Sequence, residues 1–67
     1  MEGTIVRLVK DKGYGFIRAR NEDGGKDHFF HKSALKNSIF DSLQLGQEVT
    51  FEDAETQQGL RAEDVYI

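Results

Sequence analysis

The sequence predicts an all-β domain, a five-stranded antiparallel barrel with a short helical turn after the third strand. Short segments rich in β-branched and aromatic residues are separated by turn segments that contain Gly, which is typical of a small all-β fold. The chain has 67 residues, too few for a two-sheet sandwich, whereas a small barrel limits its exposed strand edges. No linker, repeat or low-complexity tract divides the chain, so we expect residues 1–67 to form a single domain.

The first two predicted strands differ in how clearly their faces can be assigned. Residues 4–9 are β-branched and apolar but alternate imperfectly, so periodicity does not say which side chains face the core. Residues 14–20 alternate cleanly. One of their faces holds Gly15, Ile17 and Ala19, and the other is aromatic and basic, with Tyr14, Phe16, Arg18 and Arg20.

The third predicted strand completes a hairpin with the second. A turn over Asn21–Gly25 offers two Gly for positive φ and leads into residues 26–32. We expect His28 at a hairpin or edge position. Both faces of this strand are partly aromatic and one must meet the core, because Asp27, Phe29 and His31 alternate with His28 and Phe30.

Residues 33–46 combine two patterns. Leu35, Ile39 and Leu43 recur at helical spacing, whereas the polar residues among them resemble a loop. We expect a short helical turn near Ala34, capped by Ser33, followed by loop.

The last two predicted strands form a second hairpin. Residues 47–53 alternate, with Val49 and Phe51 facing inward. A turn over residues 57–59 then leads into residues 60–67, where Val65 and Ile67 share one side.

Charge is distributed unevenly along the chain. Residues 1–36 carry eight basic and five acidic side chains, a net charge of +3, whereas residues 37–67 carry one basic and seven acidic, a net charge of −6. This asymmetry predicts one basic face on a protein with a formal net charge of −3. The absence of Cys excludes disulfides and thiolate chemistry, and it favours a reducing compartment, so we expect a cytoplasmic protein. The apolar runs are far shorter than the ~20 residues of a membrane span, and we expect no membrane contact.

Aromatic side chains on neighbouring strands predict a surface on which nucleic-acid bases stack. Tyr14, Phe16, Phe29 and His31 would form one platform if the faces of the first hairpin coincide. The alternative is that Tyr14 and Phe16 face the core, which is disfavoured because two Arg on the same face could not enter a thin core unpaired. Basic side chains around the platform would follow the phosphates, namely Lys10, Lys12, Arg18 and Lys32.

Two segments resemble the ribonucleoprotein motifs of the bacterial cold shock protein family. They are Lys12-Gly13-Tyr14-Gly15-Phe16-Ile17 and Asp27-His28-Phe29-Phe30-His31-Lys32-Ser33-Ala34-Leu35, and the resemblance extends over almost the whole chain. It implies an oligonucleotide-binding (OB-fold) barrel that holds single-stranded RNA or DNA and melts weak RNA structure without ATP.

The resemblance also implies roles for particular residues. The implied stacking side chains are Tyr14, Phe16, Phe29, His31 and Phe40, with Lys12 near phosphate. The chain departs from the family where Arg7-Leu8 replaces Trp-Phe and where Lys32 replaces an aromatic residue. Arg7 can still stack its guanidinium plane on a base. Arg61 occupies a position where relatives often place a polar residue near the bases.

We therefore expect a non-enzymatic, monomeric binder of single-stranded RNA or DNA, an RNA chaperone or a regulator of transcription or translation. No small-molecule substrate, metal or cofactor is expected. His28 and His31 fall on opposite faces of a strand, and nothing supplies an oxyanion hole to Asp27, His31 and Ser33. The alternative is a diverged OB-fold protein-interaction module with weak or no nucleic-acid binding.

The departures at Arg7, Leu8 and Lys32 predict a steep salt dependence, because three stacking surfaces are lost and two cations are gained. The logarithm of the association constant should fall by about 0.7 per logarithm of salt for each phosphate neutralised on a single strand. Titrating oligo-pyrimidine DNA at low and at physiological salt measures this slope. An affinity that hardly changes between the two would contradict the expectation.

Overall fold

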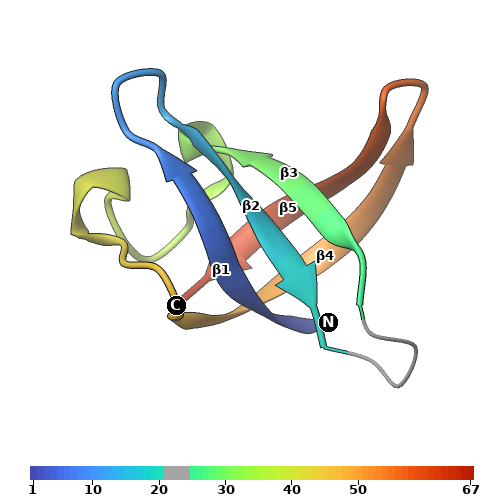
Figure 1. The fold of residues 1–67 in the computed structure, drawn as a ribbon, viewed down its shortest axis with the longest axis horizontal. Coiled ribbons are helices and arrows are strands. Elements are labelled where there is room, and N and C mark those ends of the chain that lie inside the picture. Colours follow the sequence, from blue (N-terminus) through green and yellow to red (C-terminus); the bar gives the residue numbers. More distant parts are fainter. Residues whose placement is uncertain (21–24) are drawn as a thin grey trace.

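The computed structural model describes residues 1–20 and 25–67, and Figure 1 shows its fold. The five strands are β1 (Glu2–Val9), β2 (Tyr14–Ala19), β3 (Asp27–His31), β4 (Glu48–Thr56) and β5 (Gly59–Tyr66), with the 3-10 turns η1 (Lys32–Ala34) and η2 (Phe40–Ser42) between β3 and β4. The strands close into a barrel in the order β1-β2-β3-β5-β4, which confirms the predicted fold class. Apart from Gly25, the turn predicted over residues 21–25 lies outside the described residues.

One pair of neighbouring strands in this antiparallel barrel runs parallel. β3 and β5 run parallel, with Phe29 opposite Arg61, while the other neighbouring pairs are antiparallel. The physical reason is topological. A closed ring with an odd number of strands cannot alternate direction all the way round, so one neighbouring pair must be parallel.

The register between β2 and β3 separates the aromatic side chains into two sets. Gly15 lies opposite Phe30 and Ile17 opposite His28 on the inner face, and both Phe30 and Ile17 are completely buried. The outer face carries the pairs Tyr14 with His31, Phe16 with Phe29, and Arg18 with Asp27. The core comprises Ile5, Ile17, Ala19, Phe30, Phe40, Leu43, Val49, Phe51, Ala62 and Val65. The alternation predicted for β2, β3 and β4 is therefore confirmed.

An irregularity in β1 explains why its faces could not be assigned from the sequence. The register with β2 shifts between Ile5 and Arg7, so Ile5 pairs with Ile17 whereas Arg7 pairs with Phe16. Such a β-bulge adds one residue to one strand and breaks the two-residue period. As a result Ile5 enters the core, and Arg7 lies exposed beside the outer face of β2.

Two glycines make the close packing of the β1–β2 hairpin possible. A Cβ atom at Gly15 would lie 2.5 Å from the Arg7 carbonyl oxygen and 2.9 Å from the Phe30 ring. Gly13 has a φ of +75° in the turn before β2, a conformation that L side chains rarely adopt. Gly15 therefore lets the Phe30 ring fill the interior directly beneath the strand.

His28 lies in the β2–β3 hairpin, one of the two expected positions, but its side chain is buried in the barrel, which the sequence did not predict. It is 3% exposed, and its ring lies 5.0 Å from that of Phe51. Its Nε2 is 2.7 Å from Asp53 Oδ1 and its Nδ1 is 3.1 Å from the Lys26 carbonyl oxygen. Burial is tolerated because both ring nitrogens have partners, and the contact with Asp53 joins β3 to β4, which are not neighbours in the sheet.

The second hairpin is longer than predicted. β4 continues to Thr56 rather than ending at Asp53, and Thr56 pairs with Gly59 across a turn of Gln57 and Gln58. Thr56 Oγ1 accepts a hydrogen bond from the Gln58 amide at 3.2 Å and donates one to the Gly59 carbonyl at 2.9 Å. Figure 1 shows this hairpin reaching beyond the rest of the barrel.

Truncation of the interior ring next to the outer face should unfold the protein. Phe30→Ala removes a completely buried side chain, a change that typically costs about 3 to 5 kcal/mol. A domain of this size has about 3 to 5 kcal/mol of stability in total. Urea or thermal unfolding followed by circular dichroism should therefore find the variant largely unfolded at 25 °C. A cooperative transition close to that of the parent would contradict this assignment of the core.

Candidate nucleic-acid interface

Three aromatic rings gather on the outer face of β2 and β3. The Tyr14 and Phe29 ring centroids lie 5.3 Å apart, those of Phe16 and Phe29 lie 5.9 Å apart, and those of Tyr14 and Phe16 lie 6.2 Å apart. The interplanar angles are 34°, 75° and 85° respectively, so the rings present faces and edges in different directions. All three side chains are half-exposed. We call Tyr14, Phe16 and Phe29 the aromatic surface.

The sheet register places one arginine at each end of the aromatic surface. Arg7 on β1 pairs with Phe16 on β2, Phe16 pairs with Phe29 on β3, and Phe29 lies opposite Arg61 on β5. One row across four strands thus reads cation, ring, ring, cation. The Arg61 guanidinium carbon lies 5.8 Å from the centroid of the Phe29 ring, within the range of a cation–π contact.

Arg18 lies on the same face but is engaged with a carboxylate. Its Nε donates to Asp27 Oδ1 at 2.8 Å and its Nη2 donates to Asp27 Oδ2 at 3.3 Å. These hydrogen bonds raise the pKa of Arg18 and lower the pKa of Asp27. Because the carboxyl pKa is depressed, Asp27 stays ionised at neutral pH, and the pair breaks only as the pH falls through that lowered value. Arg18 is therefore partly neutralised as a phosphate ligand.

The three predicted lysines surround a hollow, which we call the lysine hollow, next to the aromatic surface. Lys10, Lys12 and Lys32 line one hollow with Ile39 and Asp41. All three lysines are exposed. Lys10 Nζ donates to the Asp41 carbonyl oxygen at 3.4 Å, and the Lys32 amide donates to the Gly13 carbonyl at 2.8 Å. Because Gly13 also lines this hollow and Tyr14 directly follows Gly13 in the chain, the hollow lies next to the aromatic surface.

His31 lies beside Tyr14 in the β2–β3 register and also begins η1. Its Nδ1 accepts a hydrogen bond from the Ser33 amide at 3.2 Å and lies 2.9 Å from Ser33 Oγ. The helical turn predicted near Ala34 is therefore confirmed, but the prediction that Ser33 caps it is wrong, because His31 is the capping residue. These bonds hold the half-exposed imidazole at the edge of the aromatic surface.

Phe40 packs mostly in the core, and it also lines the lysine hollow. Its side chain is 6% exposed, and its ring lies 5.9 Å from that of Phe30. The preceding residue, Ile39, is 71% exposed and lines the lysine hollow. In the short turn η2 the side chains follow no regular alternation, so the sequence did not indicate which of the two faces solvent. The expected stacking role of Phe40 stays a prediction.

The tip of the second hairpin adds residues that sequence reasoning missed. Thr56, Gln58 and Leu60 line a hollow together with Phe16, Phe29 and Arg61. The turn predicted over residues 57–59 already indicated a hairpin at this position. Because β4 was expected to end at Asp53, the hairpin was too short in the prediction to reach the aromatic surface.

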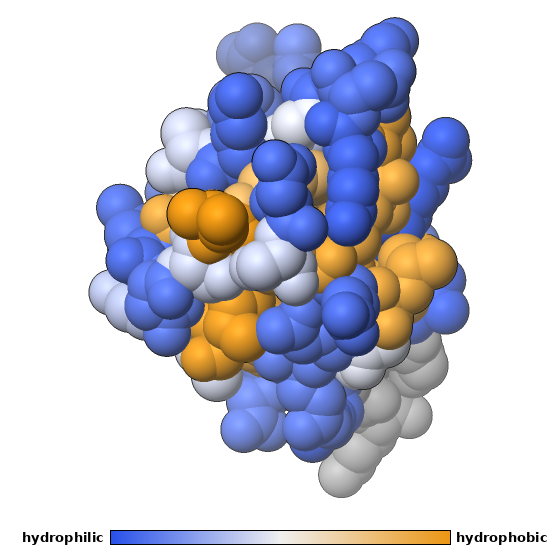
Figure 2. All heavy atoms as spheres, turned by 90° about the vertical axis from the view of Figure 1, so that its left-hand side faces the viewer, coloured by the Kyte–Doolittle hydropathy of each residue, from blue (hydrophilic) through white to orange (hydrophobic). Residues whose placement is uncertain are grey.

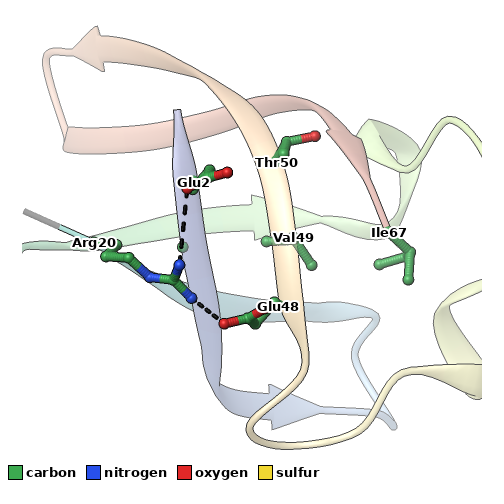
Figure 3. A pocket seen from close by; sticks show the side chains of 7 residues that line it. Glu2, Arg20, Glu48, Val49, Thr50 and Ile67 are labelled. Carbon is green, nitrogen blue, oxygen red and sulfur yellow. Dashed lines mark hydrogen bonds and ion pairs between the residues drawn. The ribbon is translucent and has the colours of Figure 1, made fainter.

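Arg20, which shares the basic face in the predicted alternation, lies in a separate ion cluster. It contacts Glu2 at 3.8 Å and Glu48 through a short ion pair. Figure 3 shows Arg20 between these two carboxylates in a hollow that also contains Val49 and Thr50. Two acidic partners neutralise this arginine, so it adds no free cation to the aromatic surface.

Figure 2 shows the side of the molecule on which the β1–β2 turn and η2 lie. Apolar residues form separate patches there, interrupted by hydrophilic side chains. Ile39 and Leu45 are among the exposed apolar residues of the molecule, at 71% and 66%. Polar side chains thus separate the apolar ones on this side.

The sequence as a whole matches one protein family. The family described as the 'Cold-shock' DNA-binding domain matches residues 1–67. The chain belongs to the cold shock domain family. Cold shock protein CspB of Geobacillus stearothermophilus is 44% identical over 63 residues, covering 94% of this chain and 91% of that protein. Cold shock-like protein CspLB of Listeria monocytogenes is 43% identical over 63 residues with the same coverage, and a cold shock-like protein of Aquifex aeolicus is 42% identical over 65 residues, 97% of this chain and 90% of that protein.

Two further findings concern the described part of this cold shock domain. Within it, no group of three His, Asp or Glu side chains is placed to hold a metal ion. Residues 1–20 and 25–67 also contain no helix that could span a membrane.

Removing the partner of Arg18 should strengthen nucleic-acid binding by this cold shock domain. Asp27→Asn removes a negative charge and frees the guanidinium for one more phosphate, which should steepen the salt slope on single-stranded DNA by about 0.7. Affinity at low salt should rise, while stability should change little because the ion pair is exposed.

Dissociation constants at several salt concentrations test this expectation. Asp64→Asn is the matched control, because Asp64 lies on β5 outside the aromatic surface and pairs there with Lys36. An unchanged slope in Asp27→Asn would show that Arg18 does not approach a phosphate.

Proposed function

We propose that this cold shock domain binds single-stranded RNA or DNA by stacking bases on Tyr14, Phe16 and Phe29. One observation carries the proposal, the cluster of three half-exposed rings on the outside of a barrel whose interior is filled by other side chains. Every base has a flat π-face, and a stacked base contributes about 1 to 3 kcal/mol whatever its identity. The family description of DNA binding supports the same function.

The cations around the aromatic surface support the binding of a polyanion such as single-stranded RNA or DNA. Arg7 and Arg61 flank the aromatic surface, and Arg18 lies at its edge. Lys10, Lys12 and Lys32, which line the lysine hollow, add further cations beyond Tyr14. Phosphate contacts to such side chains release counterions and give affinity without reading sequence. We assign phosphate binding to Arg7, Lys10, Lys12, Arg18 and Lys32, and we place His31 beside the stacked bases.

The proposed activity is binding rather than catalysis. A domain that holds unpaired bases shifts weak RNA hairpins toward the open form by mass action, without ATP. We propose that residues 1–67 do this as a single monomeric domain in the cytoplasm, as an RNA chaperone or as a regulator of transcription or translation. A barrel of this size should cover about 4 to 16 nucleotides. The alternative of a protein-interaction module is not favoured, because the surface combines rings with cations and the matching family is described as DNA-binding.

Replacing one ring of the aromatic surface should weaken binding and leave the fold intact. Phe29→Ala should lower the affinity for a thymidine heptamer by about 10-fold, because it removes a surface worth about 1 to 3 kcal/mol per base. Tyr fluorescence and amide shifts measure binding, and circular dichroism checks the fold.

Tyr66→Ala is the matched control, since Tyr66 is an exposed aromatic residue at the end of β5, 47% exposed and outside the aromatic surface. It should bind as the parent does. Equal losses in the two variants, or unfolding of Phe29→Ala, would contradict the proposed stacking surface.

A further inference from the structure

Arg61 is a half-buried arginine whose guanidinium has no acceptor among the described residues. Its Nε atom is buried and has no hydrogen-bond partner. Within residues 1–20 and 25–67, no ion pair or hydrogen bond joins its guanidinium to another group, and its one ring contact is with Phe29. Arg18 and Arg20 are instead paired with carboxylates. Withdrawing charged donors from water without acceptors is unfavourable, so this side chain is poised for an acceptor from a ligand.

The surroundings of Arg61 have the form of a site for one base. A hollow of about 290 Å³ is lined by Phe16, Phe29, Thr56, Gln58, Leu60 and Arg61. Two of these residues belong to the aromatic surface, and Leu60 adds an apolar wall. Gln58, at the tip of the hairpin, can donate or accept through its side-chain amide. A base that stacks on Phe29 would therefore have its edge beside hydrogen-bonding groups from β5 and the hairpin.

The chemistry of the guanidinium distinguishes guanine from adenine and thymine. It carries only donors, held in a rigid planar fork that matches two acceptors side by side. Guanine offers such a pair in its O6 and N7 atoms, whereas the corresponding edge of adenine combines one acceptor with one donor. In single strands these edges are open to side chains. A thymine presents no adjacent pair of acceptors to the fork, because a donor separates its two carbonyls.

We propose that Arg61 makes this hollow a base site that prefers guanine to adenine and thymine, within an interface that otherwise binds bases without regard to identity. The inference rests on the proposed function, since it requires a base stacked on the aromatic surface. A phosphate could also accept from the guanidinium fork. We favour the base edge because Arg61 lies against Phe29, where the stacked base lies, and because Arg7, at the other end of the same row, is exposed and available to the backbone.

The test uses thymidine heptamers in which a single deoxyguanosine is moved through the seven positions. The parent protein should bind the best-placed guanine heptamer roughly tenfold more tightly than the all-thymidine heptamer. Replacing that guanine by 7-deazaguanine, which lacks the N7 acceptor, should remove most of this preference. Arg61→Gln should also remove it, and should weaken binding of the guanine heptamer far more than binding of the all-thymidine heptamer. Arg61→Lys keeps the charge without the fork and should likewise lose most of the preference.

Arg7→Gln is the matched control, because it removes the same charge from the opposite end of the row. It should weaken all heptamers to a similar degree and keep the guanine preference. An equal loss for every heptamer in Arg61→Gln would assign Arg61 to phosphate and overturn the proposal, as would a parent protein that does not distinguish guanine from thymine. Failure of the parent to bind any heptamer at tens of micromolar would instead overturn the proposed function itself. Circular dichroism of each variant separates loss of binding from loss of fold.

Discussion

The pairing register of β2 with β3 is the constraint on which the surface of this protein depends. Both strands carry apolar or aromatic side chains on both faces, and a slip of one residue would exchange the inner set with the outer set. The interior determines the outcome. The Phe30 ring lies opposite Gly15, where any Cβ atom would collide with it, so only this register fits Phe30 inside. Phe16 and Phe29 are consequently left outside, facing each other across the strands.

The closure of the barrel adds a second consequence, at the parallel pair of strands. Five strands in a ring require one parallel pair, and here that pair is β3 with β5. The pairing brings Arg61 next to Phe29 although the two residues lie far apart in the sequence. The extended β4–β5 hairpin then reaches the same place with Gln58. Topology, rather than any local motif, thus joins the polar groups of the second hairpin to the rings of the first.

These two features also explain what could be predicted from the sequence. The inner and outer faces of β2 and β4 follow from a local two-residue period, and Ile17, Val49 and Phe51 lie in the core as that period predicts. The period of β3 separates Phe29 from Phe30 but does not say which of the two faces inward. The bulge in β1 breaks the period, so the outward position of Arg7 required the structure. The burial of His28 depends on Asp53, a partner on another strand, and no pattern around His28 indicates it.

The loop before β4 was the least predictable part of the candidate site. Phe40 and Ile39 are adjacent apolar residues in a segment without a period, and the structure buries the first and exposes the second. The parallel pairing of β3 with β5 could have been inferred by counting strands, since an odd ring requires it. The register of β3 with β5 could not be inferred from the sequence, because the register depends on how the barrel packs around its core.

A protein with a net charge of −3 can bind a polyanion because its charges are segregated by the same topology. β4 pairs with β1 and β5 and does not neighbour β2 or β3, so its outward residues Glu48 and Glu52 lie on a different part of the barrel from the aromatic surface. Arg20 further offsets Glu2 and Glu48 locally. The molecule measures 30 × 25 × 18 Å, whereas the Debye length at physiological salt is about 8 Å. Charges on opposite sides are therefore largely screened from each other, and an approaching strand responds to the cations beside the rings rather than to the net charge of the whole protein.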